Sequence, residues 1–497
     1  MNFRSTRSDE CVSPSYALLH GLAADGGLYV PESFPEKVLS YKELAGKSYQ
    51  EIAEAVLSHF FTNFTAEERK QMISSAYNDT TFRDDRIVPL HSIDTDLSIA
   101  ELFHGRTLAF KDLALSLFPY LLTAAKKQEK EDRDILILTA TSGDTGKAAL
   151  EGFKDVAGTN IMVFYPSEGV SPMQKQQMQK QEGNNVKVSA IYGNFDDAQS
   201  FLKRVFTSAE VNAYANDKGV LFSSANSINI GRLFPQVAYY VSTYVSLVDN
   251  GAISEGETFD VIVPTGNFGN ILAAYLAKQM GVPIKTLICA SNDNKVLYDF
   301  FTTGTYDRKR EFILTNSPSM DILISSNLER LIYLSTGCDA AADAALMKDL
   351  SEKGSYTVTE NMRQFMSDFR GGFATEAQNE ATISKIFEDT GYLIDTHTGV
   401  AATVYNAYKA ETGDQTKTVI ASTASPYKFS HSVLEAIKGK SAVEGKDEFA
   451  VVDELSEVSG TPVPKAVEEL RSAVIRHNTE CDVDKMGETV KNILGIA

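Results

Sequence analysis

The chain has 497 residues, which is long enough for two or three packed domains, and its 43% hydrophobic and 23% charged residues are typical of a globular protein. Its 47 basic and 66 acidic side chains give a net charge of −19. This balance argues against a general nucleic-acid or membrane-surface binder, because both need a basic face, although backbone N–H groups can still hold a small anion locally.

The first 95 residues show two amphipathic patterns. They predict helices at residues 51–61 and 66–77, after a turn at Asp25 to Gly27. We expect an N-terminal helical subdomain in which the sequence reveals no chemistry.

The next segment, residues 101–122, carries Lys111 at the head of a strongly apolar run. Beside apolar side chains such as Phe103 and Phe110, an ammonium loses hydration and is easier to deprotonate, so Lys111 is a candidate nucleophile. The alternative is an ordinary lysine that extends its ammonium into water. Taken alone, this segment favours the ordinary lysine.

Short apolar runs alternate with helical patterns in the rest of the chain. Strands are predicted at residues 135–138, 160–166, 185–192, 259–264 and 418–421. Strands that alternate with helices predict a mostly parallel sheet covered on both faces, and ligands of such sheets bind beyond the carboxyl ends of the strands. Residues 311–391 are predicted to be helical, and the tail from residue 438 a linker with a closing helix.

Two glycine-bearing loops each lie between a predicted strand and a predicted helix. Residues 264–270, PTGNFGN, can turn backbone N–H groups toward one point at a helix N-terminus, which binds phosphate; a tight turn without a ligand is the alternative. Residues 141–147, TSGDTGK, fail the Walker A spacing, because threonine stands at position 141 and alanine at position 148. That loop is either an ordinary helix cap or an anion-binding cap.

Other polar clusters are less specific. Residues 422–426 place short hydroxyls at a strand end, and residues 223–232 form either a polar pocket or an Asn-capped loop. The four cysteines form no CxxC pair and the seven histidines show no zinc spacing, so we expect reduced thiols and no metal. Because we find no signal-peptide pattern and no apolar run of roughly 18 residues, we expect a cytoplasmic protein.

These features together indicate pyridoxal 5'-phosphate as a cofactor. A lysine with apolar walls can hold it covalently while a glycine loop holds its phosphate. A nucleotide-hydrolysing enzyme would need a Walker lysine and an acidic magnesium site, and the sequence provides neither.

Six motifs, in this order and at these distances, resemble threonine synthases of the long bacterial and fungal type. They are STRSDECVSPSYALLHGLAADGGLYVPESFP, ELFHGRTLAFKD, LTATSGDTGKAA, SSANSINIGRLFPQ, VPTGNFGNILA and STASPYKF. The resemblance implies an α/β protein with the fold type II architecture of pyridoxal phosphate enzymes, in which the cofactor lies between two open, mostly parallel α/β domains. The expected domain ranges are 1–95 for the N-terminal subdomain, 96–225 with Lys111, 226–440 with the phosphate loop, and 441–497 for the linker and tail.

The resemblance also implies an activity and a set of site residues. This family of lyases converts O-phospho-L-homoserine and water to L-threonine and phosphate in the last step of threonine biosynthesis. Lys111 would bind the cofactor and act as a general base, and the uncharged Thr423 hydroxyl would leave the pyridine nitrogen largely unprotonated. The other implied cofactor residues are Asn226, Gly266, Asn267, Phe268, Gly269 and Asn270. The implied substrate residues are Thr141, Ser142, Asp144, Thr145, Asn229, Arg232 and Lys147.

Some positions depart from the family pattern. The chain has Arg106 where the family usually has proline, and Ser425 where the family motif has histidine. Two alternatives therefore stay open. One is a related lyase or dehydratase acting on another hydroxy or phosphorylated amino acid, and the other is a non-catalytic descendant that binds a phosphorylated metabolite or a partner protein. For the enzyme, we expect a monomer or homodimer.

Overall fold

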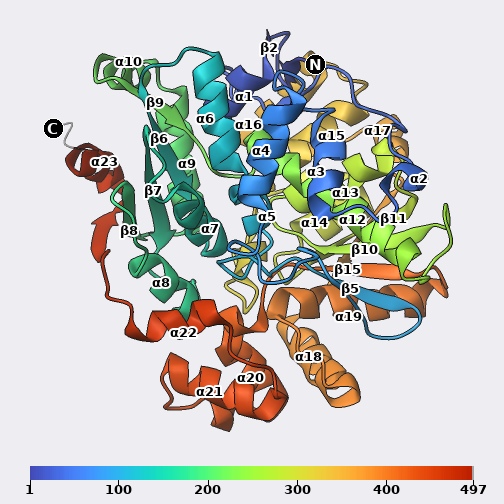
Figure 1. Ribbon diagram of the computed structural model, residues 1–497. Helices are drawn as coiled ribbons and strands as arrows, with labels where there is room; N and C mark the ends of the chain where they lie inside the picture. Colours follow the sequence, from blue (N-terminus) through green and yellow to red (C-terminus); the bar gives the residue numbers. More distant parts are fainter. Residues whose placement is uncertain (495–497) are drawn as a thin grey trace.

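Two sheets organise the computed structural model, which describes residues 1–494 (Figure 1). The larger sheet has six strands in the order β14-β11-β10-β15-β5-β4, and its neighbouring strands are parallel except β5 and β4 at one edge. Its strands are β4 (Leu90–Ser92), β5 (Leu97–Glu101), β10 (Phe259–Pro264), β11 (Ile284–Ser291), β14 (Phe369–Phe373) and β15 (Thr418–Ser422). The central strands β10 and β15 are buried throughout, which explains why the sequence shows apolar runs there.

The smaller sheet has five parallel strands in the order β16-β8-β7-β6-β9. They are β6 (Asp134–Ala140), β7 (Thr159–Pro166), β8 (Val186–Tyr192), β9 (Val220–Ser223) and β16 (Thr479–Asp482). Its connecting helices are α7 (Asp144–Phe153), α8 (Pro172–Gln179), α9 (Phe195–Thr207) and α10 (Ala209–Asp217). Since β7 and β8 add on one side of β6 and β9 on the other, right-handed crossovers place α7 and α9 on opposite faces.

Helices also cover both faces of the larger sheet. Helix α19 (Thr396–Thr412) packs across four of its strands, while α13 (Gly269–Met280) and α14 (Val296–Thr303) pack on its other face. Helix α12 (Pro235–Asp249) lies on α13, and α18 (Glu376–Thr390) lies on α19. The predicted α/β architecture, with parallel strands at the five predicted runs, is confirmed.

The N-terminal region differs in part from the all-helical expectation. Helices α3 (Tyr49–Leu57) and α4 (Ala66–Ala76) lie where the amphipathic patterns predict them, and both begin with capping boxes, Ser48 with Glu51 and Thr65 with Glu68. The region also contains α1 (Pro14–His20), α2 (Tyr41–Leu44) and a small antiparallel sheet of β1 (Phe3–Ser5), β2 (Cys11–Val12) and β3 (Tyr29–Pro31). Strands of two or three residues are too short to show a hydrophobic alternation.

Two later regions also contain strands that the sequence does not predict. The elements between β11 and α18 include β12 (Thr305–Asp307), α15 (Leu328–Ser335), α16 (Ala340–Lys353), β13 (Ser355–Thr357) and α17 (Glu360–Phe365). The tail comprises α20 (Ser430–Lys438), α21 (Glu448–Ser459), α22 (Lys465–Ser472), β16 and α23 (Met486–Leu494). Helix α20 packs on α18 beside the larger sheet, whereas β16 is an edge strand of the smaller sheet. The tail therefore joins the two halves of the molecule, one built around the larger sheet and the other around the smaller sheet.

The lysine segment, residues 101–122, forms several short elements. The chain leaves β5, makes a turn, and forms the short helix α5 (Asp112–Leu115) and then α6 (Phe118–Gln128), so Lys111 stands directly before α5. Strand β5 pairs with β15 of the larger sheet, although the sequence groups it with the smaller one. Among residues 1–494, no helix is both long and apolar enough to cross a membrane.

Candidate active site

A cavity lies where the carboxyl ends of strands from both sheets meet. It is lined by the turn after β10, by Thr423 after β15, by Thr145 in the first turn of α7, and by Asn226 after β9. Lys111 and Phe110 close it from the segment between β5 and α5. Loops at the carboxyl ends of parallel strands are where α/β proteins bind ligands, so this cavity is the candidate active site.

Residues 266–270 form an anion cradle at the N-terminus of α13. Phe268 has a left-handed backbone with φ of 64°, and its ring is buried near Phe301 and Phe369, which keeps this turn in place. The N–H groups of residues 266–269 donate none of the hydrogen bonds found among the described residues. A Cβ atom on Gly266 would lie 2.3 Å from the carbonyl oxygen of Ser319, so only glycine fits there.

Two buried donors beside the cradle also lack partners. Arg232, only 2% exposed, leads from the short helix α11 (Ile230–Leu233) into the cavity, and its Nε has no hydrogen-bond partner. The Nδ2 of Asn270 is also buried and unpartnered, while its Oδ1 accepts hydrogen bonds from Tyr239 and Tyr240. Unpaired buried donors are costly, so these groups and the free N–H groups fit a bound phosphate.

Lys111 is buried and lines the same cavity. Its Nζ lies 3.6 Å from Oδ2 of Asp144 and 4.6 Å from the centre of the Phe110 ring. Burial lowers the pKa of Lys111 from its ordinary value of 10.5 to about 8, although the nearby Asp144 carboxylate opposes this change. At pH 7 this pKa leaves about a tenth of Lys111 as the neutral amine that a nucleophile or general base requires.

The backbone around Lys111 is fixed by the segment after β15. The Phe110 N–H donates to the carbonyl of Thr423 at 2.8 Å, and the Ser425 N–H donates to the carbonyl of Leu108 at 3.0 Å. These two bonds hold the lysine segment and Thr423 at a constant spacing.

A second, fully buried lysine shares the carboxylate of Asp144. The Nζ of Lys428 lies 2.8 Å from Oδ1 of Asp144 and donates to the carbonyl of Thr107 and to Oε1 of Gln177. Burial alone would raise the pKa of the Asp144 carboxyl, but Lys428 and Lys111 hold it well below its usual range. Asp144 is therefore a permanent anion between two lysines.

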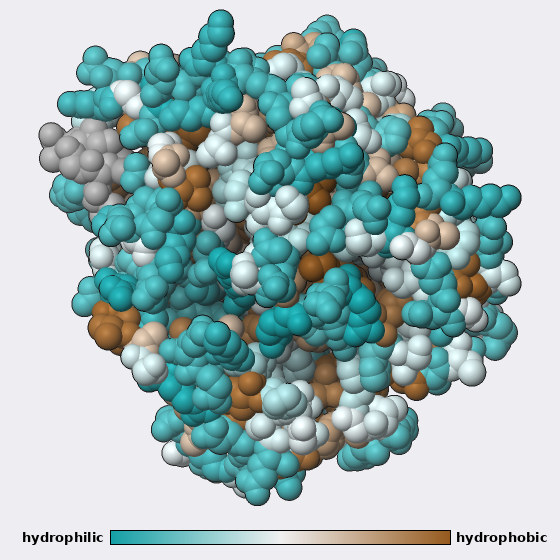
Figure 2. All heavy atoms as spheres, in the orientation of Figure 1, coloured by the Kyte–Doolittle hydropathy of each residue, from teal (hydrophilic) through white to brown (hydrophobic). Residues whose placement is uncertain are grey.

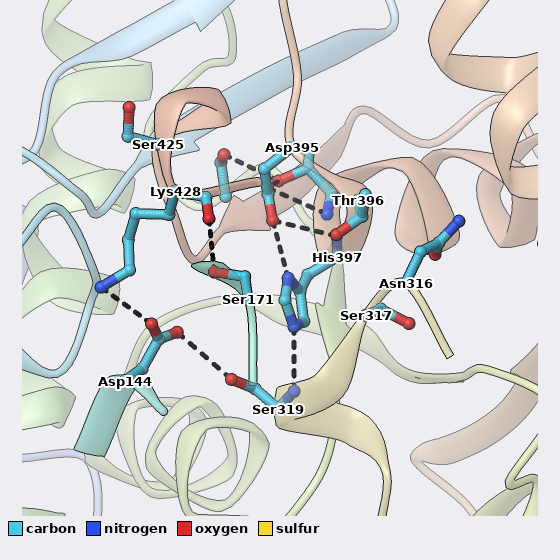
Figure 3. Close-up of polar contacts among 12 residues, drawn as sticks. Asp144, Ser171, Asn316, Ser317, Ser319, Asp395, Thr396, His397, Ser425 and Lys428 are labelled. Carbon is cyan, nitrogen blue, oxygen red and sulfur yellow. Dashed lines mark hydrogen bonds and ion pairs between the residues drawn. The ribbon is translucent and has the colours of Figure 1, made fainter. Parts of the chain in front are cut away.

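A chain of hydrogen bonds continues from Asp144 to α19 (Figure 3). The Ser319 hydroxyl donates to Oδ2 of Asp144 at 3.2 Å, and the Ser319 N–H donates to Nε2 of His397 at 3.1 Å. The other ring nitrogen, Nδ1, lies 2.8 Å from Oδ2 of Asp395. These partners assign a neutral His397 that donates to Asp395 and accepts from Ser319.

The structure brings most of the predicted site residues to this cavity. The lining residues from the prediction are Lys111, Thr145, Asn226, Arg232, Gly266, Asn267, Phe268, Gly269, Asn270 and Thr423. Asp144 is next to the cavity through its contact with Lys111. Thr141 is buried and does not line the cavity; its hydroxyl accepts hydrogen bonds from the N–H groups of Gly143 and Gly146, which fixes the loop before α7.

Three predicted substrate residues lie elsewhere. Ser142 lines a neighbouring cavity between the smaller sheet and residues 312–321. Asn229 is completely buried and caps α11, donating to the carbonyl of Leu18, so its amide supports the fold. Lys147 is one turn further along α7 and pairs with Glu151 at 3.3 Å, away from the cofactor cavity.

Sequence reasoning missed four functional neighbours: Ser319, Asp395, His397 and Lys428. Each lies more than 170 positions from Asp144 in the chain, so spacing could not join them. The usable signals were the motifs DTHTGV and STASPYKF, which contain His397 and Lys428. Among residues 1–494 there is no group of three or more His, Cys, Asp and Glu side chains that could hold a metal ion.

Comparisons with known proteins agree with this geometry. Residues 87–424, more than half of the chain, match the family described as pyridoxal-phosphate dependent enzymes. Residues 2–77 match the threonine synthase N terminus, and residues 398–475 match the threonine synthase C-terminal family. The solved structure of a PLP-bound threonine synthase from Brucella melitensis superposes with a TM-score of 0.84 and 36% identity, covering 99% of this chain and 98% of that one.

The fold and the site thus define a pyridoxal-phosphate dependent enzyme of fold type II. Curated relatives narrow this class: the chain is 35% identical over 468 residues to threonine synthase of Saccharomyces cerevisiae, covering 88% of this chain and 89% of that protein. The chain belongs to the threonine synthase family. It is also 39% identical over 438 residues to human threonine synthase-like 1, covering 86% of this chain, and it spans 58% of that longer protein.

Proposed function

We propose that this protein converts O-phospho-L-homoserine and water to L-threonine and inorganic phosphate. The observation that carries the proposal is Lys111, a buried lysine with a lowered pKa that lines one small cavity together with an anion cradle. Family membership supports the choice of reaction, since relatives that cover most of this chain are named threonine synthase.

The residues present fit pyridoxal phosphate. The free N–H groups of residues 266–269 would hold its phosphate, Lys111 would bind it covalently, and Thr423 would face its pyridine nitrogen. The bound cofactor supplies an electron sink that stabilises negative charge on substrate carbons. The Thr423 hydroxyl carries no charge, so it does not favour protonation of the ring nitrogen.

The protein's own groups carry the proton transfers. With a pKa of about 8, Lys111 can both accept and return a proton at physiological pH, and the Asp144 carboxylate 3.6 Å away stabilises its protonated form. Lys428 keeps Asp144 charged and fixed in place throughout. One amine can therefore move protons at the Cα and Cβ atoms of the substrate in successive steps.

Loss of the substrate phosphate requires positive charge nearby. Arg232 is the buried cation of this cavity whose Nε is still free, and burial lowers its pKa to about 10, so it remains charged at neutral pH. We assign Arg232 to the leaving phosphate, where fixed charge in a dry site stabilises the growing dianion.

An absorption spectrum of the purified protein, taken before and after adding O-phospho-L-homoserine, tests the assignment. We expect a cofactor band that changes with substrate, and equal amounts of phosphate and threonine. A cofactor band without threonine would favour a related lyase acting on another amino acid. Protein that is supplied with pyridoxal phosphate and shows no band would instead support a non-catalytic binding protein.

The proposal extends to partners and location. We propose a small-molecule substrate, no nucleic-acid partner, and a cytoplasmic monomer or homodimer. The net charge of −19 supports the lack of a nucleic-acid partner, because phosphate backbones are bound by basic surfaces.

A further inference from the structure

A second cavity, of about 890 Å³, opens beside α7 and shares no lining residue with the cofactor cavity among the residues described. Segments far apart in the sequence form it: residues 79–83, residues 105–106, one face of α7, the end of α8, and α22. This region is on the face shown in Figure 2, where the surface around α7, α8 and α22 is largely hydrophilic.

Cations outnumber acids in this cavity. Its cations are Arg83, Arg106, Lys147, Lys154, Lys180 and Lys465, and its acids are Asp79, Glu151, Glu182 and Glu469. Six against four gives a local charge of +2, in a chain whose net charge is −19. Such a local reversal of charge is what the capture of an anion requires.

Four of these cations pair with Glu151, Glu182 or Glu469, and the other two, Arg83 and Lys180, form no ion pair with a carboxylate among residues 1–494. The Arg83 guanidinium has a single weak hydrogen bond, 3.5 Å to the carbonyl of Phe103, and Lys180 donates to the carbonyl of Leu470 at 2.7 Å. A bound anion would supply the negative charge that these two cations lack.

Two further cations, Arg106 and Lys147, are already held in position. Arg106 donates through Nε to the carbonyl of Thr80 at 3.1 Å, and its Nη1 lies 3.7 Å from Glu151. The same carboxylate pairs with Lys147, so Glu151 fixes two cations at neighbouring points of the wall. Preorganised donors bind a ligand without an ordering cost at the moment of binding.

We propose that this cavity is a second anion site, which takes a small molecule bearing two or more phosphate groups. A single phosphate is too small for this volume, which is typical of pockets for larger ligands. The guanidinium groups of Arg83 and Arg106 have the planar donor geometry that recognises phosphate.

The site is also connected to the catalytic lysine. Gln177 lines the cavity, and its Oε1 accepts a hydrogen bond from Nζ of Lys428 at 3.1 Å. Lys428 pairs with Asp144, which pairs with Lys111. A ligand that contacts Gln177 therefore changes the field at Lys111, which makes the site regulatory.

Calorimetric titration of the holoenzyme with inorganic pyrophosphate tests the binding. The variants are the double substitution Arg83→Gln with Arg106→Gln, and Arg86→Gln as a matched control. Arg86 is on the same loop, is 68% exposed and pairs with Asp84, and it does not line the cavity. We expect saturable binding to the wild type and to the control, and affinity at least about tenfold lower in the double variant, because two charge-assisted contacts to the anion are lost.

Two outcomes would refute the proposed anion site. One is no saturable binding of pyrophosphate to the wild type, and the other is the same pyrophosphate affinity in the double variant as in the wild type. Melting temperatures and cofactor content identify any variant that misfolds, and Arg83→Gln alone then replaces the double substitution. The regulatory link is tested by titrating the cofactor band with pH, with and without pyrophosphate. We expect a shifted midpoint in the wild type and none in the double variant, and an unshifted wild type would refute the link.

Discussion

Replacing Lys428 by methionine should raise the pKa of Lys111 and slow catalysis at neutral pH. Lys428 is one of the cations that lower the pKa of Lys111 electrostatically, and it shares Asp144 with Lys111. Without it, the carboxylate acts on Lys111 alone, 3.6 Å away. Both changes favour the ammonium form of Lys111.

The size of the effect follows from the titration. A rise of about one pH unit from the pKa of about 8 lowers the neutral fraction of Lys111 at pH 7.5 from about 24% to about 3%, roughly eightfold. Because Lys111 would be bound covalently to the cofactor until substrate is present, its amine would titrate in the enzyme–substrate complex, and the rising limb of kcat should move to higher pH. The variant should also be less stable by about 3–5 kcal/mol, the cost of leaving a buried carboxylate with one partner fewer.

The assay is phosphate release from O-phospho-L-homoserine between pH 6.5 and 9.5, with urea unfolding measured in parallel. Lys348→Met, at an ion-paired surface lysine that is 69% exposed, is the matched control and should behave as the wild type. Adding Asp144→Asn to Lys428→Met should recover stability, because it removes the uncompensated charge. A Lys428→Met variant that is folded, loaded with cofactor and unchanged in its pH profile would refute the reasoning.

Three further predictions concern the cavity itself. Lys111→Ala should abolish turnover and let dialysis remove the cofactor, and a variant with ordinary activity would exclude Lys111 as the reacting amine. Thr423→Asp should change the cofactor absorption spectrum by favouring a protonated ring nitrogen; an identical spectrum would mean that Thr423 does not face the ring. Gly266→Ala should weaken cofactor binding at least about tenfold, because the new Cβ would lie 2.3 Å from the Ser319 carbonyl oxygen. Equilibrium titration with the cofactor measures this change. Gly487→Ala is the control, because its Cβ would lie 3.7 Å from the nearest atom.

The parts of the fold that the sequence predicts are those with a local signal. The runs at 135–138 and 418–421 are buried strands in the structure because parallel strands covered on both faces must be apolar along their whole length. Short strands such as β1 and β12 are too short to show a periodic pattern, and they form because the folded chain pairs them with other strands. The same is true of β16, which joins the smaller sheet from the far end of the chain.

In the candidate site, too, the residues with a local sequence signal were predicted and those brought together only by folding were not. Lys111 and the turn at 266–270 were found because one stretch of sequence carries each signal. The roles of Lys428 and His397 depend on side chains that only the folded chain brings together, as the ion pair of Lys428 with Asp144 demonstrates. Lys147 was misleading because it follows the loop at 141–146 in sequence, while the turn of α7 directs it into the other cavity.

The tail gives the molecule a mechanical property. Helix α20 is attached to one half through α18, and β16 is attached to the other half through β8, with the N–H groups of Arg476 and His477 also anchored on the carbonyl of Gln179. The chain between these attachments works as a tether, and its contour length limits how far the two halves can separate without breaking one attachment. Lengthening this tether by inserting flexible residues would widen the range of motion of the two halves and leave every residue that lines the cofactor cavity unchanged.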